Sequence, residues 1–180
     1  MNTKKQTATQ HLFTNKQLRT LLVPIMVEQL LSSLMGTADT MMVSNVGSAA
    51  ISAVSLVDAI NILVIQALSA LAAGGAILCS QYLGSQNLKK AKCSAEQVLF
   101  VMLVLSCSLS LLCLIFRFPL LRLIFGTVDT DVMANSQIYF FFTLLSFPFI
   151  GLYDAGASIL RAQNNTKGPM TISILSNFLN

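Results

Sequence analysis

The sequence predicts an all-α protein that crosses a membrane several times. Hydrophobic residues make up 54% of the 180 residues and charged residues only 10%, whereas about a quarter of the residues in a typical soluble domain are charged. Segments 59–88, 98–116 and 132–153 contain no charged side chain. Because about 20 apolar residues span the hydrocarbon core of a bilayer, each of these segments is long enough for a transmembrane helix.

Four complete helices and the beginning of a fifth are predicted, at about 18–43, 54–83, 95–116 and 136–160, and then from 169 to the end. Apolar residues recur with the helical period in each of them. Residues 1–17 are expected to form a polar tail, and residues 18–180 an incomplete transmembrane unit. Since the fifth helix stops well short of the roughly 20 residues of a span, we expect the chain to be the N-terminal fragment of a longer membrane protein.

The distribution of basic residues predicts the orientation of the chain. Nine of the 11 Lys and Arg lie in the N-terminal tail and in the connections after the second and fourth helices. They are Lys4, Lys5, Lys16, Arg19, Lys89, Lys90, Lys92, Arg161 and Lys167. Because basic residues gather in cytoplasmic connections, we expect a multi-pass protein of the cell (plasma or inner) membrane with a cytoplasmic N-terminus. This bias also explains the net charge of +4, so we expect no nucleic-acid partner.

Proline and glycine residues predict where the helices end or bend. Pro119 opens a short apolar run with arginines at its edges, which is typical of a brief helix in the outer interface, and Gly126 is expected to end it. Gly84 is expected to stop the second helix. Pro148 and Gly151 predict a bend in the fourth helix.

Small residues in the second helix and the cysteines are interpreted as packing residues. The run "SALAAGGA" at 69–76 is expected to let another helix approach closely. Cys79, Cys93, Cys107 and Cys113 form no CxxC pair, and we expect them to act as small hydrophobic residues without a disulfide or a metal. We therefore expect neither an enzyme nor a bound cofactor.

The first helix carries acidic residues within an apolar sequence. Glu28, Ser32, Gly36 and Asp39 share one face of the helix, and Gln29 widens this polar stripe. Glu28 and Asp39 point the same way, about 16 Å apart along the axis. A charge inside the bilayer costs about 2.5–3.5 kcal/mol, so this face is expected to meet a cavity or a partner. Carboxylates there can exchange a proton for a metal ion or a cationic ligand.

Several of the polar residues can be interpreted in a second way. Asp39 can be an interfacial residue near water, and Glu28 can form a helix–helix hydrogen bond. Asp58 is expected to be interfacial. Asp154 can pair with Arg161, seven residues further along the same helix, or have a functional role.

The fifth helix carries a polar stripe of its own. Ser173, Asn177 and Asn180 share one side of it. Two amides in an apolar helix suit either interhelical hydrogen bonding or the coordination of an ion.

Three stretches of the chain resemble the multidrug and toxic compound extrusion (MATE) family. They are "VPIMVEQLLSSLMGTADTMMVSNVG" in the first helix, "GGAILCSQYLGSQNLKKAK" at the end of the second and "SILRAQNNTKGPMTISILSNFLN" across the fourth and fifth. The order, spacing and membrane side of these stretches carry the resemblance, which extends over nearly the whole chain.

The resemblance implies a fold of two six-helix lobes around a central cavity that opens alternately to each side. This chain would supply four complete helices and part of a fifth of the N-terminal lobe. The resemblance further implies antiport, in which cationic and amphipathic drugs and other toxic compounds leave the cell while Na⁺ or H⁺ enters. The partners are then these compounds, the lipid bilayer and the missing C-terminal lobe.

The resemblance also assigns roles to residues. The Asp-Thr pair in the family's first helix matches Asp39 and Thr40, which marks Asp39 as the residue that couples transport to the ion, and as a ligand if the ion is Na⁺. The family's fifth-helix asparagine matches Asn180, or Asn177 in the other alignment. The residues then expected to line the cavity are Glu28, Gln29, Ser32, Gly36 and Thr40.

Other functions remain open at this point. A lipid-linked oligosaccharide flippase of the same superfamily is expected to have a more basic cavity, whereas these helices carry acidic and amide groups. An inactive truncated remnant is a second alternative, because half of the cavity would be missing. An intramembrane protease is disfavoured, because "LYD" at 152–154 lacks a GxGD partner in this sequence.

Overall fold

The structure, a computed structural model, describes residues 15–45, 47–126 and 128–179, and these residues are almost entirely helical. The helices are α1 (Asn15–Ser44), α2 (Ser48–Gly84), α3 (Leu88–Ile115), α4 (Arg117–Phe125), α5 (Thr130–Ala162) and α6 (Lys167–Leu179). The predicted all-α fold is confirmed. The helices begin earlier than predicted, because polar residues such as Lys89 and Lys90 in α3, and small residues such as Ala49 and Ala50 in α2, continue the helix beyond its most apolar part.

Four of the described helices are long and apolar enough to cross a membrane. These spans are Leu18–Ser44, Ser48–Gly84, Leu88–Ile115 and Thr130–Ala162. Many large apolar side chains on them are exposed, including Leu63, Phe100 and Phe149. A soluble protein would not leave so many apolar side chains in water, so these faces are suited to lipid.

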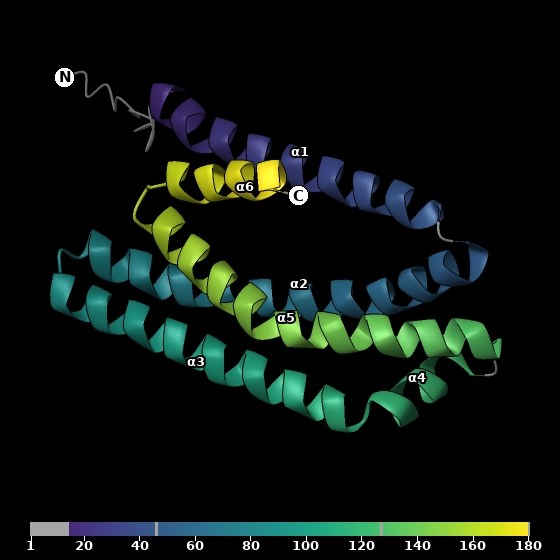
Figure 1. The fold of residues 1–180 in the computed structure, drawn as a ribbon. Helices are drawn as coiled ribbons and strands as arrows, with labels where there is room; N and C mark the ends of the chain where they lie inside the picture. The colour runs from purple at the N-terminus through teal and green to yellow at the C-terminus, as the bar shows by residue number, and fades with distance from the viewer. Residues whose placement is uncertain (1–14, 46, 127, 180) are drawn as a thin grey trace, which may run out of the picture.

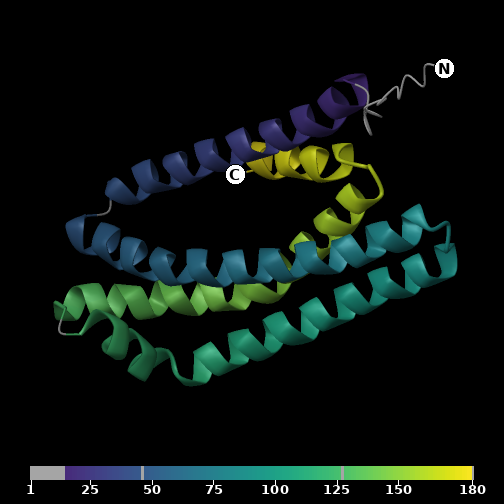
Figure 2. The ribbon, with the colours of Figure 1, turned by 180° about the vertical axis from the view of Figure 1, so that it is seen from behind.

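The helices form two layers that diverge from one another (Figures 1 and 2). Helices α2, α3 and α5 pack against each other, with the most extensive contact between α2 and α5, and we call them the α2–α3–α5 unit. Helix α6 packs mainly on α1, and we call these two the α1–α6 pair. The turn between α1 and α2 joins the layers at one end of the molecule, and the turn between α5 and α6 joins them at the other.

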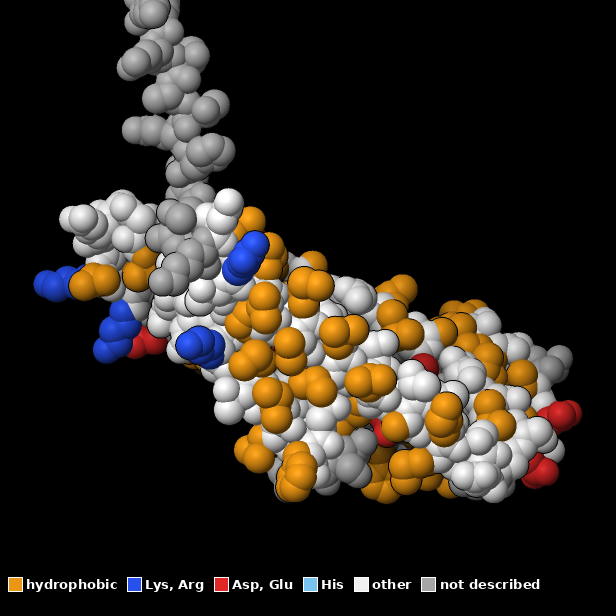
Figure 3. Space-filling view, turned by 90° about the horizontal axis from the view of Figure 1, so that it is seen from above, with side chains coloured by type: hydrophobic (Ala, Val, Ile, Leu, Met, Phe, Trp, Pro, Cys, Tyr) orange, Lys and Arg blue, Asp and Glu red, His pale blue; other side chains and the backbone are white. Residues whose placement is uncertain are grey.

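The two ends of the molecule carry different charges. We call the end with the α2–α3 and α5–α6 turns the basic end, because Lys89, Lys90, Lys92, Arg161 and Lys167 lie there. The other end, with the α1–α2 turn, is the hairpin end. Figure 3 shows the basic side chains gathered at one end of the visible face, a broad apolar region beside them, and a few acidic side chains spread over the face, including its other end. This arrangement is that of a protein whose middle lies in hydrocarbon.

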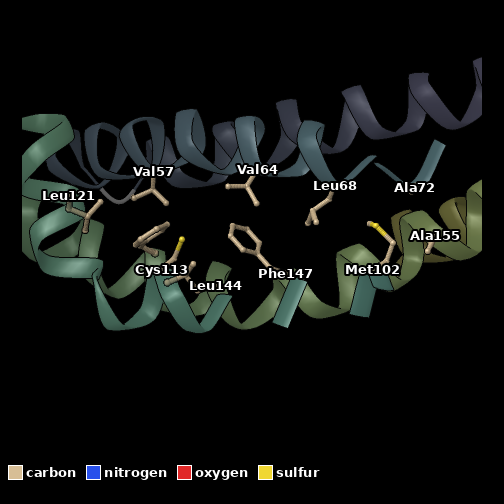
Figure 4. Packing of buried hydrophobic residues seen from close by; sticks show 11 residues of the cluster. Val57, Val64, Leu68, Ala72, Met102, Cys113, Leu121, Leu144, Phe147 and Ala155 are labelled. Carbon is tan, nitrogen blue, oxygen red and sulfur yellow. The ribbon is translucent and has the colours of Figure 1, made fainter. Parts of the chain in front are cut away.

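One apolar core holds the α2–α3–α5 unit together (Figure 4). The buried residues of α2 recur every three or four positions along one face of the helix, as the helical period requires. The core consists of Val57, Val64, Leu68, Ala72, Met102, Cys113, Leu121, Phe140, Leu144, Phe147 and Ala155. Helix α4 contributes Leu121, so the short helix is anchored to the unit.

Small residues allow close packing in this unit, as the run at 69–76 predicted. A Cβ atom added to Gly75 would collide with the side chain of Val98 on α3. A Cβ atom added to Gly151 of α5 would lie 2.8 Å from the Cβ of Ser106. Gly151 therefore serves packing as well as the predicted bend.

The bend in α5 and the brief helix α4 are both observed. Pro148 lies inside α5, and the helix changes direction midway along its length (Figures 1 and 2). A proline removes one backbone hydrogen bond and its ring clashes with the preceding turn, which bends the helix. Gly126 follows α4 with φ 63 and ψ −135, a conformation that a residue with a side chain rarely adopts.

The second helix ends at Gly84, as predicted. In the turn that follows, the residue with a left-handed backbone is Gln86, at φ 57. Asn164 takes the same conformation, at φ 61, in the turn between α5 and α6. An amide side chain tolerates this region better than a β-branched one, so both turns form without glycine.

All four cysteines are free thiols. Cys79 and Cys113 are buried, as expected for small hydrophobic residues, whereas Cys93 and Cys107 are exposed on α3. The interpretation of all four as packing residues is therefore right for two of them.

Candidate functional site

Asp39 lies in the part of α1 nearest the hairpin end, within the span Leu18–Ser44. Its side chain is exposed, as are the cavity-lining candidates Gln29, Ser32, Gly36 and Thr40. The Thr40 hydroxyl donates to the Gly36 carbonyl at 2.8 Å, so its proton is used within its own helix. Asp39 is therefore an accessible carboxylate on a largely apolar helix.

A second acidic residue of the spans, Asp58 of α2, is bonded to another helix. The Tyr139 hydroxyl of α5 donates to Oδ1 of Asp58 at 3.0 Å, and Nδ2 of Asn61 donates to the same oxygen at 3.3 Å. We call Asp58, Asn61 and Tyr139 the Asp58 cluster. It brings together polar groups from α2 and α5, which are far apart in the sequence.

One hydrogen-bond acceptor atom of the Asp58 cluster has no donor among the described residues. Asn61 is buried, and its Oδ1 atom has no hydrogen-bond donor in the described part of the chain. Buried polar atoms are nearly always satisfied by protein, water or an ion. Carboxylate, amide and phenol oxygens are hard ligands of the kind that coordinate Na⁺, and a carboxylate also takes up H⁺. The cluster can therefore hold either ion.

The interpretation of Asp58 as a merely interfacial residue is therefore incomplete. Asp58 is half-buried and bonded to another helix. Sequence reasoning missed its partner, because nothing local distinguishes Tyr139 from the other aromatic residues of α5. The only available signal was that α2 and α5 both run from the hairpin end to the basic end, with Asp58 and Tyr139 near the start of each.

A second polar cluster joins the two layers toward the basic end. Glu28 is buried, and its Oε1 atom lies 2.7 Å from Nη2 of Arg161 and accepts a bond from the Tyr153 hydroxyl at 3.1 Å. We call these three residues the Glu28 cluster. The Thr166 hydroxyl also donates to the Thr20 carbonyl nearby, at 3.4 Å. These contacts tie α1 to α5 and to the start of α6.

Glu28 thus forms a helix–helix hydrogen bond, which was one of the two roles that the sequence predicted for it. Glu28 and Asp39 differ in environment despite the shared helix face, since one is buried and paired and the other is exposed. Removing the charge of Arg161 would leave the Glu28 carboxylate buried in a medium that solvates it poorly. The Glu28 cluster therefore has a structural role in the described residues.

The predicted pair of Asp154 and Arg161 does not form a bond. Arg161 takes Glu28 instead, and Asp154 accepts a hydrogen bond from the hydroxyl of Ser69 on α2. Seven residues along one helix span about 10.5 Å, which is too far for these two side chains to meet easily. A partner on a neighbouring helix lies closer, and sequence spacing alone does not reveal it.

The amides of α6 lie at a different level from Asp39. Helices α1 and α6 run side by side in the same direction from the Thr20–Thr166 bond (Figure 1). At about 1.5 Å per residue, Asn177 lies about 12 Å short of Asp39 along the axis. Asn177 donates to the Ser173 carbonyl at 2.8 Å. Asn180 lies outside the described residues.

No group of three or more His, Cys, Asp or Glu side chains comes together in the described ranges. A cation at the Asp58 cluster would be held by one carboxylate, that of Asp58, together with neutral oxygens of Asn61 and Tyr139. Such a small set of ligands binds an ion weakly.

Comparison with known proteins identifies the family of the chain. The sequence pattern of the MatE family matches residues 24–180. The chain belongs to the MatE family. It is 30% identical over 158 residues to the uncharacterised transporter YisQ of Bacillus subtilis (strain 168), a match that covers 87% of this chain and 34% of that protein. The chain is thus part of a transporter family.

A solved structure shows the same fold. It is that of a MOP superfamily transporter from Pyrococcus furiosus Vc1 (DSM3638), in which a binding pocket of reversed polarity is said to suggest a different function. The two structures have a TM-score of 0.84 and 23% sequence identity, over 91% of this chain and 36% of that one. The MatE chain described here spans about a third of the length of both proteins.

Proposed function

We propose that this MatE chain forms part of a secondary active antiporter. The antiporter exports cationic and amphipathic drugs and other toxic compounds across the cell membrane while Na⁺ or H⁺ moves inward. The observation that carries the proposal is an accessible carboxylate, Asp39, within a membrane span. A charge is costly in such a place, and function is the usual reason that it is kept.

The proposed cycle uses competition between two cations. Binding of Na⁺ or H⁺ at Asp39 shifts the conformation of the lobe and weakens binding of the cationic compound, which then leaves outward. The ion is afterwards released inward. A single carboxylate couples the two events because each ligand changes the affinity for the other by the same factor.

The remaining parts of the proposal concern the rest of the transporter. The basic end faces the cytoplasm, because basic residues favour that side. Asn177 and Asn180 belong to the fifth membrane helix, which begins with α6, and supply amides to the same cavity. A second lobe provides the other half of the cavity, in agreement with the greater length of the relatives.

The substitution Asp39→Asn tests the proposal. In the full-length protein, we expect it to abolish ethidium efflux driven by a Na⁺ or pH gradient, while the amount of protein inserted in the membrane stays unchanged. The two gradients are imposed separately, so that the wild-type response identifies the coupling ion. Ethidium export by Asp39→Asn at the wild-type rate would refute the role of Asp39.

The matched control is Asp131→Asn, which removes the same charge from an exposed position in the first turn of α5. It is expected to leave efflux unchanged. If both variants lose efflux equally, the effect is one of overall charge and not of a site.

A lipid-linked oligosaccharide flippase is the competing function. The reversed pocket polarity described for the archaeal relative makes pocket charge the property to examine. Asp39 and Asp58 place acidic groups on α1 and α2, which favours a cationic cargo over a phosphorylated one. Translocation of a lipid-linked oligosaccharide in vesicles, without ethidium efflux, would favour the flippase instead.

A further inference from the structure

A cavity of about 910 Å³ opens at the basic end between α2, α3 and α5. It lies between the last residues of α2, the first two turns of α3 and the end of α5. Its polar lining consists mainly of Ser80, Lys92, Arg161, Gln163 and Asn164. The volume is typical of a ligand pocket. No residue of the Asp58 cluster lines it, so it is separate from the proposed transport site.

The lining of this cavity is positively charged. Lys92 and Arg161 both line it, and no carboxylate does. Lys89 and Lys90 lie on the same part of α3, outside the lining. The nearest acidic neighbour of Lys92 is Glu96, whose Oε1 atom lies 3.8 Å from Nζ in a strongly exposed pair. Such exposed pairs contribute little, so Lys92 remains available to another anion.

Arg161 is only partly neutralised by its own partner. Its Nη2 atom donates to Glu28, but Nε is buried without an acceptor in the described part of the chain. The acceptor oxygen of Glu28 is also shared with the Tyr153 hydroxyl. The guanidinium side chain is 33% exposed, so a second anion can approach from the cavity.

The beginning of α3 adds to the positive potential. Asn87 caps the helix by accepting a bond from the Lys90 backbone N–H at 3.2 Å, and Leu88 and Ala91 of the first turn line the cavity. The N-terminal end of a helix dipole stabilises negative charge nearby. The same wall is apolar, since Leu83 and Leu88 face the cavity as well.

Charged and apolar linings together suit a lipid better than a soluble anion. The cavity lies where the spans α2, α3 and α5 end, which is the level of the lipid headgroups. Below it, α2 and α3 expose apolar side chains such as Ile77, Leu78 and Phe100 to the hydrocarbon. Basic pockets between transmembrane helices at this level bind anionic headgroups in other membrane proteins.

We propose that this cavity binds the headgroup of an anionic phospholipid. The phosphate lies between Lys92 and Arg161, and the acyl chains lie against the exposed apolar surfaces of α2 and α3. The site is independent of the proposed transport function, because it uses other residues at the other end of the molecule. The bound lipid also covers the polar side of the Glu28–Arg161 pair that joins α1 to α5.

Native mass spectrometry of the purified full chain tests this site. Phosphatidylglycerol and phosphatidylcholine with identical acyl chains are added at equal concentration. We expect about tenfold tighter binding of phosphatidylglycerol, since each basic residue near a headgroup contributes severalfold. Equal binding of the two lipids would overturn the proposal.

Two variants of equal charge separate a site from a diffuse basic surface. Lys92→Gln is expected to weaken phosphatidylglycerol binding about fivefold, whereas Lys89→Gln, which does not alter the lining, has a much smaller effect. Both residues are exposed, so neither substitution threatens the fold. Equal losses in the two variants would show that the lipid binds a general basic surface, and the proposal of a site in the cavity would be wrong.

Two further variants change the site in opposite directions. Glu96→Gln removes the carboxylate that competes for Lys92 and is expected to tighten phosphatidylglycerol binding. Gly84→Leu fills the cavity without altering charge, and it has room to do so because no heavy atom lies within 4 Å of an added Cβ atom. It is expected to cause a loss of phosphatidylglycerol binding, and unchanged binding would count against the cavity.

A competition experiment distinguishes a lipid from a soluble phosphate. Glycerol phosphate at the same concentration as the lipid is expected not to displace phosphatidylglycerol, because it lacks the acyl chains. Full displacement would show that the cavity takes a soluble phosphate, and the assignment to a lipid would be wrong.

Discussion

The α2–α3–α5 unit and the α1–α6 pair are held in place by different forces. Phe140, Leu144 and Phe147 are buried in the unit with almost no exposed surface. Helix α1 leaves most of its apolar side chains exposed, and the side-chain bonds that tie it to α5 are those of Glu28. The unit is therefore stabilised by packing, whereas α1 is positioned by a few polar contacts. No described residue of α1 belongs to the apolar core of the unit.

The largest expected effect is on the packed unit. Phe147→Ala removes a ring that is 1% exposed and leaves a cavity, so the free energy of unfolding should fall by about 3–5 kcal/mol. The measurement is reversible unfolding in mixed micelles, followed by far-UV circular dichroism. Phe149→Ala, at a position that is 72% exposed, is the matched control and should change stability little. Equal losses would show that the core assigned to this unit is wrong.

The next effect concerns the link between the unit and the pair. Arg161→Met leaves Glu28 buried without its cation, and the free energy of unfolding should fall by about 3 kcal/mol. The double variant Glu28→Gln with Arg161→Met should recover part of this loss, because no charge is then left buried. If the double variant is as unstable as the sum of the single variants, the two residues do not interact.

A smaller effect is expected where α2 meets α3. Gly75→Ala forces a Cβ atom against Val98 and should cost about 1–3 kcal/mol in the same unfolding measurement. Gly74→Ala introduces the same atom at the neighbouring position, where nothing lies within 4 Å. It should be neutral or slightly stabilising. The difference between these two variants measures how closely the helices of the unit approach.

The smallest effect on stability should come from the Asp58 cluster. Tyr139→Phe removes one hydrogen bond to Asp58, and the free energy of unfolding should fall by only about 0.6 kcal/mol. A loss of several kcal/mol would show that this cluster is a structural element like the Glu28 cluster. A small loss of stability, together with reduced efflux in the full-length protein, would show that the Asp58 cluster takes part in transport.

Most of the fold could be predicted from the sequence. Composition and uncharged segments are sufficient to identify the spans, because hydrocarbon excludes charge and requires internal backbone bonding. Pro119 and Gly126 similarly located α4. Helix ends were less predictable, since polar residues such as Lys89 and Lys90 extend a helix that hydropathy places further on.

The candidate site could be predicted only in part. The sequence singled out Asp39 and Glu28 and the helix face that they share. It could not show that Glu28 is paired and Asp39 accessible, because that depends on which helix lies opposite each one. Asp58 and Tyr139 were not connected for the same reason, and the cavity at the basic end is formed by three segments that no motif links.

The sequence by itself determined that the protein lies in a membrane, the number and order of its helices, and the family to which the chain belongs. Helical period and hydropathy are local properties, so they can be read along the chain. The tertiary structure alone decided which charges meet. Glu28 and Arg161 are 133 residues apart, and Asp58 and Tyr139 are 81 apart. These pairs form because the packing of α2 against α5, and the divergence of α1 from both, set which helix faces come within the reach of a side chain.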